Sequence, residues 1–210
     1  MADENAPDEP CFGPGDVDIT GRDRAYEGFF KVERLQLHHR LFRGGWSGTL
    51  SRELLIRRDA VGVLPYDPGL DAVLLVEQLR VGALGRPRSP WLLELVAGLI
   101  DAGEEPADVA RREALEEAGC ELGALEPIHS YFSSPGGTSE YFYLYCGRAG
   151  LAGAGGVFGL SGEGEDIRAR VFGLGEALAA VSSGRVADAH TLIALQWLQL
   201  ERSRLRELWR

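Results

Sequence analysis

Apolar and polar residues alternate in the first part of the chain with the period of two that is typical of β-strands. Between Val17 and Arg57, the segments FFKVERLQLHHRLF and TLSRELLIRR follow this alternation, with Gly44-Gly45 between them. The pattern predicts an N-terminal antiparallel β-sheet over residues 17–57. Such strands present unpaired backbone groups at their edges, so we expect this sheet to need a partner.

Longer apolar runs after residue 57 predict a second, more deeply buried sheet. AVGVLPYD and AVLLVEQLR flank a turn at Pro68-Gly69, and the second segment is apolar enough for the centre of a sheet. WLLELVAGLI predicts one strand that runs into Gly98. IHSYFSSPGGTSEYFYLYCG predicts a strand, a turn and a strand, and a last strand is expected over residues 167–172.

Helical signals mark three segments, over residues 106–118, 175–182 and 188–208. Pro106 suits the first turn of the first helix, and Gly119 suits its end.

The stretch from Gly147 to Gly164 contains eight glycines in eighteen residues, which predicts a mobile loop. Together, these elements predict a mixed α/β (α+β) domain over residues 58–210, in which mostly antiparallel strands pack against helices.

Residues 1–16 differ from the rest of the chain because they are rich in acidic residues and proline. This composition predicts a disordered acidic tail. The tail has no basic segment followed by an apolar run, so we expect no signal peptide. No apolar run approaches the roughly 20 residues that span a bilayer, so we expect no membrane association.

Charge and cysteine content narrow the possible partners and location. The formal net charge of -10 predicts a surface that repels the phosphates of nucleic acids. A small phosphate-bearing substrate stays possible where a metal ion or clustered arginines invert the local field. The three cysteines are widely separated and form no CxxC pair, so we expect neither a disulfide framework nor a zinc site, and a cytoplasmic location.

The helix predicted over residues 106–118 places glutamates beside a stripe of small residues. On a helical wheel the stripe consists of Ala107, Ala110, Ala114 and Ala118. Glu113, Glu116 and Glu117 fall beside it within an arc of roughly 100°. Arg112 can pair with Glu116, and nothing local is expected to neutralise the other two glutamates. Clustered carboxylates of this kind suit Mg²⁺, whereas a solvated acidic helix face is the alternative interpretation.

The glutamates belong to a longer pattern, formed by Gly98, Glu104, Arg112, Glu113, Glu116, Glu117 and Gly119. Seven such residues at fixed spacing arise by chance at on the order of 10⁻⁸ per start position. The pattern is identified as a Nudix box, so the chain resembles the Nudix hydrolases. Ala114 and Cys120 stand where the family usually has bulky aliphatic residues, which concerns packing more than chemistry. We interpret Cys120 as a core residue.

The resemblance implies the Nudix fold, with mixed β-sheets sandwiched between α-helices and an N-terminal antiparallel β extension. Segments beyond the box narrow the resemblance to the bacterial ADP-ribose diphosphatases, over about residues 20–205. These segments are YEGFF, VEQLRVGA, WLLELVAGLID, SSPGGTSE, GEGEDI and ALQWLQL. The implied reaction is metal-dependent hydrolysis of the pyrophosphate bond of ADP-ribose to AMP and ribose 5-phosphate. Two to three Mg²⁺ (or Mn²⁺) ions and a homodimer formed through residues 17–57 are implied as well.

The same resemblance implies roles for individual residues. The implied metal ligands are the backbone carbonyl of Ala97 and the side chains of Glu113, Glu117 and Glu165. The implied catalytic residues are Glu163, Glu116 and Arg112. The implied substrate contacts are Phe29 of the partner subunit on adenine, Arg52 and Arg80 on the pyrophosphate and adenosine parts, Glu140 near the terminal ribose, and Gly98.

General chemistry agrees with these implied roles. A pyrophosphate resists water because its negative oxygens repel a nucleophile, and Mg²⁺ ions can neutralise that charge and activate a water molecule. A carboxylate such as Glu163 can then accept the proton. Its place between Gly162 and Gly164 suits a loop that closes over substrate, although an acidic insertion that only keeps the chain soluble is the alternative.

Two other functions remain open at this point. One is hydrolysis of a different nucleoside diphosphate sugar, such as another ADP-sugar or GDP-mannose. The other is a non-catalytic nucleotide sensor built on the same scaffold. The complete acidic set of the box argues against a sensor, because a sensor does not need every one of these carboxylates.

Overall fold

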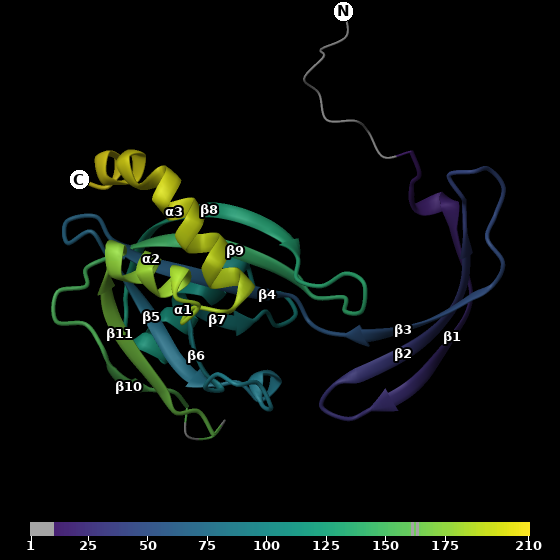
Figure 1. Ribbon diagram of the computed structural model, residues 1–210, viewed down its shortest axis with the longest axis horizontal. Coiled ribbons are helices and arrows are strands. Elements are labelled where there is room, and N and C mark those ends of the chain that lie inside the picture. The colour runs from purple at the N-terminus through teal and green to yellow at the C-terminus, as the bar shows by residue number, and fades with distance from the viewer. Residues whose placement is uncertain (1–10, 161, 163) are drawn as a thin grey trace, which may run out of the picture. The chain divides into compact units, whose positions relative to one another are not determined.

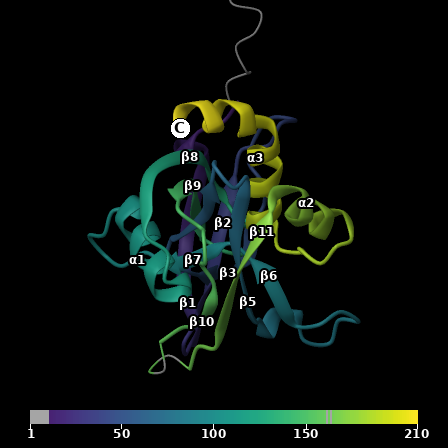
Figure 2. The same cartoon turned by 90° about the vertical axis from the view of Figure 1, so that its left-hand side faces the viewer.

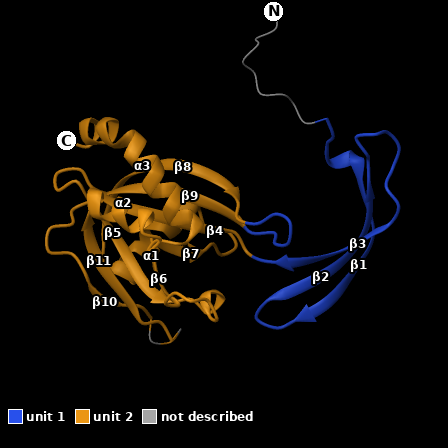
Figure 3. Ribbon diagram, in the orientation of Figure 1, with its two compact units in different colours: residues 1–57, 134–140 blue, residues 58–133, 141–210 orange. Residues whose placement is uncertain are grey.

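The computed structural model describes residues 11–160, 162 and 164–210, and Figure 1 shows their arrangement into helices and strands. The chain divides into two compact units (Figure 3). Unit 1 contains residues 1–57 and 134–140, and unit 2 contains residues 58–133 and 141–210.

Unit 1 is built on a three-stranded antiparallel sheet. Its strands are β1 (Val17–Glu27), β2 (Lys31–His39) and β3 (Leu50–Ile56), in the order β1-β2-β3. The N-terminal sheet predicted over residues 17–57 is therefore present. A short 3₁₀ helix, η1 (Pro14–Asp16), comes before it. The last three residues of the segment 1–16, expected to be a disordered tail, are therefore in regular structure, whereas residues 1–10 lie outside the described part.

The segment 134–140 extends unit 1 in a way that the sequence does not reveal. The Leu55 N–H donates to the Gly137 carbonyl oxygen at 2.9 Å, and the Ser139 N–H donates to the Leu55 carbonyl oxygen at 3.0 Å. These bonds attach the SSPGGTSE turn to β3, although about 80 residues of unit 2 separate the two segments in the chain.

Unit 2 contains an eight-stranded sheet. Its strands are β4 (Ala60–Asp67), β5 (Ala72–Leu79), β6 (Trp91–Glu94), β7 (Val96–Leu99), β8 (Leu122–Phe132), β9 (Tyr141–Ala149), β10 (Gly156–Phe158) and β11 (Ile167–Gly173). Six follow the order β10-β11-β5-β4-β9-β8, whereas β6 pairs with β5 and β7 pairs with β4. The central place predicted for the AVLLVEQLR strand is confirmed, and only the β4–β9 pair is parallel among the described strands.

Helices cover both faces of this sheet. They are α1 (Pro106–Ala118), α2 (Leu174–Ser182) and α3 (Ala189–Leu208), with a short 3₁₀ helix η2 (Val81–Ala83) after β5. Figure 2 shows α1 on one face and α2 with α3 on the other, which gives each face its own buried core. No helix among the described residues is long and apolar enough to cross a membrane.

Two predictions about this sheet are wrong in detail. WLLELVAGLI forms two strands, β6 and β7, rather than one. β4 and β5 pair directly only near Tyr66 and Val73. Further along, β6 pairs with β5 and β7 pairs with β4, so this segment changes its pairing partner at Leu95. The glycine-rich stretch is not a loop throughout, because β9 runs to Ala149 and β10 pairs with β11.

Candidate active site

Helix α1 holds the glutamates of the box against the sheet. It begins with Pro106 in its first turn and ends at Gly119, which has the left-handed φ of 57° that suits a glycine cap. Val109, Ala110, Ala114 and Ala118 are buried on one face of the helix and belong to the core shared with the sheet. Because these residues are small, the helix lies close to β4 and β7, and the side chains at the edge of this face are drawn toward the sheet.

Gly98 on β7 meets the side chain of Glu113 on α1. A Cβ atom placed on Gly98 would overlap the Glu113 carboxylate, so no larger residue fits at this position without displacing it. Gly98 pairs with Val61 of β4, which fixes the position of its backbone. We call Gly98, Glu113 and Glu117 the glutamate edge of α1.

Glu117 is the most deeply buried acid of the box, with 4% of the residue exposed. Its Oε2 accepts the Ala97 N–H at 3.1 Å, and its Oε1 accepts the Gln78 side-chain amide at 3.4 Å. Burial raises the pKa of Glu117 to about 8, and the charge of Glu113 adds to the rise. The carboxylate therefore lies where a cation would stabilise its ionised form.

Glu113 has a similar electrostatic environment. Burial raises its pKa to about 7, while Arg112 opposes the rise and Glu116 contributes to it. Arg112 Nη1 lies 2.9 Å from Glu113 Oε1 and 3.0 Å from Glu116 Oε2. The predicted pair with Glu116 is confirmed, whereas the expectation that nothing local neutralises Glu113 is wrong. The guanidinium contacts the next residue in the chain as well as the residue four positions further on, and the contact with Glu113 only partly offsets the burial of that carboxylate.

Glu165 approaches the same region from the loop after β10. Its charge contributes to the raised pKa of Glu113, and its Oε2 accepts the Leu160 N–H at 3.0 Å. Among the described residues, no three histidine, cysteine or acidic side chains converge closely enough to hold a metal ion in this conformation. Glu163 lies outside the described residues.

Arg80 stands at the end of β5, close to the glutamate edge. Its Nε lies 2.7 Å from Oε2 of Glu94, an acid that is only 8% exposed. The positive charge of Arg80 also lowers the pKa of Glu117, opposing the effect of burial. A cavity of about 570 Å³ borders this pair, and its wall includes Arg86 and Leu92.

The remaining predicted substrate contacts lie in unit 1. Phe29 is 88% exposed and contacts Phe30 edge-on at 4.9 Å between ring centroids. Arg52 is exposed on β3, and Glu140 is 8% exposed with an oxygen 2.6 Å from Arg57 Nε. Unit 1 thus holds these three predicted residues on different segments: Phe29 between β1 and β2, Arg52 on β3, and Glu140 in the segment 134–140.

Two residues of this region were missed in the sequence. Gln78 contacts Glu117, and Glu94 pairs with Arg80, so both act on predicted site residues. A signal was present, because both are polar residues within strongly apolar strand segments, and a buried polar side chain requires a partner. Cys120, by contrast, is buried as predicted, and burial raises its pKa to about 11.

Comparison with known proteins agrees with this geometry. The family model described as the NUDIX domain matches residues 56–195, so the chain belongs to the Nudix family. ADP-ribose pyrophosphatases from Haemophilus influenzae and Escherichia coli K12 are 45% and 44% identical to the chain, over 202 and 198 residues. These matches cover 95% and 94% of the chain, and 93% and 95% of the two relatives.

More distant relatives carry a different name. A GDP-mannose pyrophosphatase from Cronobacter sakazakii is 36% identical over 154 residues, which cover 71% of the chain and 78% of that protein. The crystal structure of an ADP compounds hydrolase matches with a TM-score of 0.69 at 20% identity, over 91% of the chain and 97% of that structure. This last similarity concerns the fold alone, and the predicted Nudix fold is confirmed.

Proposed function

We propose that this chain hydrolyses the pyrophosphate bond of ADP-ribose and releases AMP and ribose 5-phosphate. The observation that carries the proposal is the glutamate edge of α1, where burial raises the pKa of two neighbouring carboxyl groups, Glu113 and Glu117. The chain belongs to the Nudix family, in which such carboxylates form the box. The choice of substrate is supported by relatives named ADP-ribose pyrophosphatase that match nearly the whole chain.

A divalent cation fits this edge because the donors are hard carboxylate oxygens whose ionised form is disfavoured without a positive partner. Glu113, Glu117 and the carbonyl oxygen of Ala97 would hold it, and Glu165 would join them after leaving the Leu160 N–H. Two to three Mg²⁺ or Mn²⁺ ions are proposed. When bound, such ions neutralise the charge of a pyrophosphate and lower the pKa of the attacking water.

The protein residues orient the substrate and move the proton. We assign to Glu163 the role of the base that accepts the proton of the attacking water. Arg112 and Glu116 position Glu113 through the contacts of 2.9 Å and 3.0 Å described above. Gly98 contributes by leaving space beside the Glu113 carboxylate.

Four side chains are assigned to substrate recognition. Arg80 and Arg52 would bind the pyrophosphate and adenosine parts, and Glu140 the terminal ribose. Phe29 would stack on adenine in the site of a second copy of the chain, and its 88% exposure leaves the ring available. A homodimer formed through the β1–β3 sheet is supported by the nearly complete exposure of β1. The three unpaired cysteines support a cytoplasmic location.

GDP-mannose is the second candidate substrate, because relatives named GDP-mannose pyrophosphatase match 70–71% of the chain. Their lower identity and shorter coverage favour ADP-ribose. The deciding experiment compares kcat/KM for ADP-ribose, another ADP-sugar and GDP-mannose with purified chain and Mg²⁺. A preference for ADP-ribose of at least about tenfold is expected, which corresponds to about 1.4 kcal/mol. A preference for GDP-mannose would overturn the substrate assignment, and tight binding of ADP-ribose without turnover would indicate a nucleotide sensor.

A further inference from the structure

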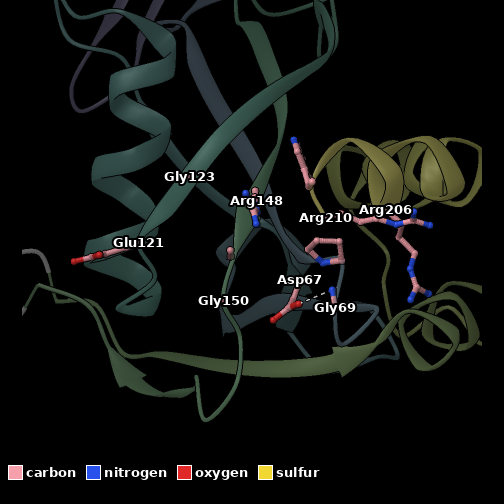
Figure 4. A pocket seen from close by; sticks show the side chains of 11 residues that line it. Asp67, Gly69, Glu121, Gly123, Arg148, Gly150, Arg206 and Arg210 are labelled. Carbon is pink, nitrogen blue, oxygen red and sulfur yellow. Dashed lines mark hydrogen bonds between the residues drawn. The ribbon is translucent and has the colours of Figure 1, made fainter.

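A separate cavity of about 660 Å³ lies at the end of the sheet where β4 ends, and Figure 4 shows its lining residues. The β4–β5 turn, the start of β8, the end of β9 and the C-terminal end of α3 form its walls. Gly62, which pairs with Ala97, lies five residues before Asp67 along β4. This separation corresponds to about 17 Å of strand, so the cavity is distinct from the glutamate edge.

Three arginines line the cavity, and their charges are mostly unpaired. Arg148 comes from the end of β9, whereas Arg206 and Arg210 come from the end of the chain. Within the described part of the chain, Arg148 and Arg210 form no side-chain hydrogen bond and no ion pair. Arg206 lies 3.9 Å from Asp71, whose carboxylate already pairs with Arg202.

Among the described residues, the two carboxylates that line the cavity form no ion pair with these arginines, although the charge of Arg148 contributes to the lowered pKa of Asp67. Oδ1 of Asp67 accepts the Gly69 N–H at 2.9 Å and the Leu70 N–H at 3.0 Å, and its Oδ2 accepts the Leu151 N–H at 2.9 Å. In the view of Figure 4, Glu121 lies on the α1 side of the cavity and points away from α3. Three arginines thus line this cavity in a chain whose formal net charge is -10.

We propose that this cavity binds a small anion that carries two or more phosphate groups. A guanidinium group matches the geometry of phosphate oxygens with two parallel hydrogen bonds. The volume lies within the roughly 300–1,000 Å³ that is usual for small-molecule sites. Gly150 also lines the cavity, and a Cβ atom placed on it meets no atom within 4 Å, so a ligand has open space beside the backbone at this position.

Isothermal titration calorimetry with inorganic triphosphate tests this proposal directly. The full chain is titrated in a buffer with EDTA, where the acidic glutamate edge carries no metal ion that would attract phosphate. We expect one site per chain, and we expect Arg148→Gln with Arg206→Gln to weaken binding at least about tenfold. Competition by ADP at the same site would identify nucleotides as ligands, whereas competition by inorganic pyrophosphate alone would restrict the site to inorganic anions.

Two variants keep this test interpretable. Gly150→Asp adds a carboxylate where a Cβ has space, so it should abolish binding without disturbing packing, even if the double arginine variant folds poorly. Arg43→Gln removes one positive charge from an exposed position outside the cavity, and it should bind triphosphate as the parent chain does. Absence of binding by the parent chain, or full binding by Gly150→Asp, would overturn the proposal.

Discussion

At the scale of single residues, the glutamate edge is determined by steric and electrostatic fit rather than by composition. Gly98 is required because the Glu113 carboxylate occupies the space that its Cβ would take. Helical periodicity places Glu113 and Glu117 on one side of α1 in the sequence alone. The partners of Glu117, Gln78 and Ala97, could not be assigned in this way, because strand pairing brings them to the helix from other parts of the chain.

The close approach at Gly98 predicts a specific effect of one added methyl group. Gly98→Ala should lower kcat/KM for ADP-ribose by about 100-fold or more, because the methyl group displaces the Glu113 carboxylate. Steady-state kinetics with Mg²⁺ measures this loss. Gly175→Ala is the matched control, since its added Cβ meets nothing within 4 Å in α2, and it should retain activity. An active Gly98→Ala enzyme would show that the position of Glu113 is unimportant.

Glu94 is expected to act as a positioning residue through Arg80. Glu94→Gln should raise KM about tenfold with kcat nearly unchanged, because the Arg80 guanidinium loses its charged partner at 2.7 Å. Glu77→Gln serves as the control, because it removes an acid of β5 that pairs with Arg168 and Arg185 instead of Arg80. Equal effects of both substitutions on KM would assign Glu94 a purely structural role.

At the scale of elements, most helices and strands of unit 2 could be predicted, whereas their pairing could not. The bounds of α1 are given by Pro106 and Gly119, which carry local signals. WLLELVAGLI is divided into β6 and β7 at Leu95, and no local sequence signal marks this break. The break arises because β6 pairs with β5 whereas β7 pairs with β4. β10 was hidden among glycines, although the ring of Phe158 lies against Gly119 at the end of α1.

The contact between Gly119 and Phe158 can be separated from backbone strain. Gly119→Ala should lower the free energy of unfolding by about 1–2 kcal/mol, because of the left-handed φ and the overlap with the Phe158 ring. Urea denaturation measures this change. A double-mutant cycle with Phe158→Ala separates the two causes. Without the Phe158 ring, Gly119→Ala should cost less stability, because only the backbone strain at position 119 remains. Strictly additive effects would mean that the ring and the glycine do not interact.

At the scale of the whole molecule, the buried cores on the two faces of the sheet and one polar network hold unit 2 together. Asp71 lies in the turn before β5, accepts the Tyr66 hydroxyl at 2.8 Å and pairs with Arg202 of α3. This network connects β4 to α3 across one of those cores. The sequence predicted both elements, yet their contact depends on the tertiary packing of α3, which no local pattern encodes.

This network predicts how stability depends on pH. The hydrogen bonds from Arg202 lower the pKa of Asp71 below its ordinary 3.8, and the Tyr66 hydroxyl adds to this effect. Because the folded-state pKa is lowered, the stabilisation is present above about pH 4 and is lost as the pH falls through the folded-state value. Asp71→Asn should therefore reduce Tm at pH 7, and this reduction should shrink as the pH falls below about 4. A difference in Tm that grows as pH falls would contradict this explanation.

The most direct test of the proposed function is ³¹P NMR of ADP-ribose with the purified chain, with and without Mg²⁺. We expect the pyrophosphate signals to be replaced by two phosphomonoester signals, from AMP and ribose 5-phosphate, only when Mg²⁺ is present. Glu117→Gln, which removes the charge of the most buried acid of the box, should slow this conversion by at least about 100-fold. Unchanged pyrophosphate signals with the parent chain and Mg²⁺, or equal conversion by Glu117→Gln, would contradict the proposal that the glutamate edge holds the catalytic metal.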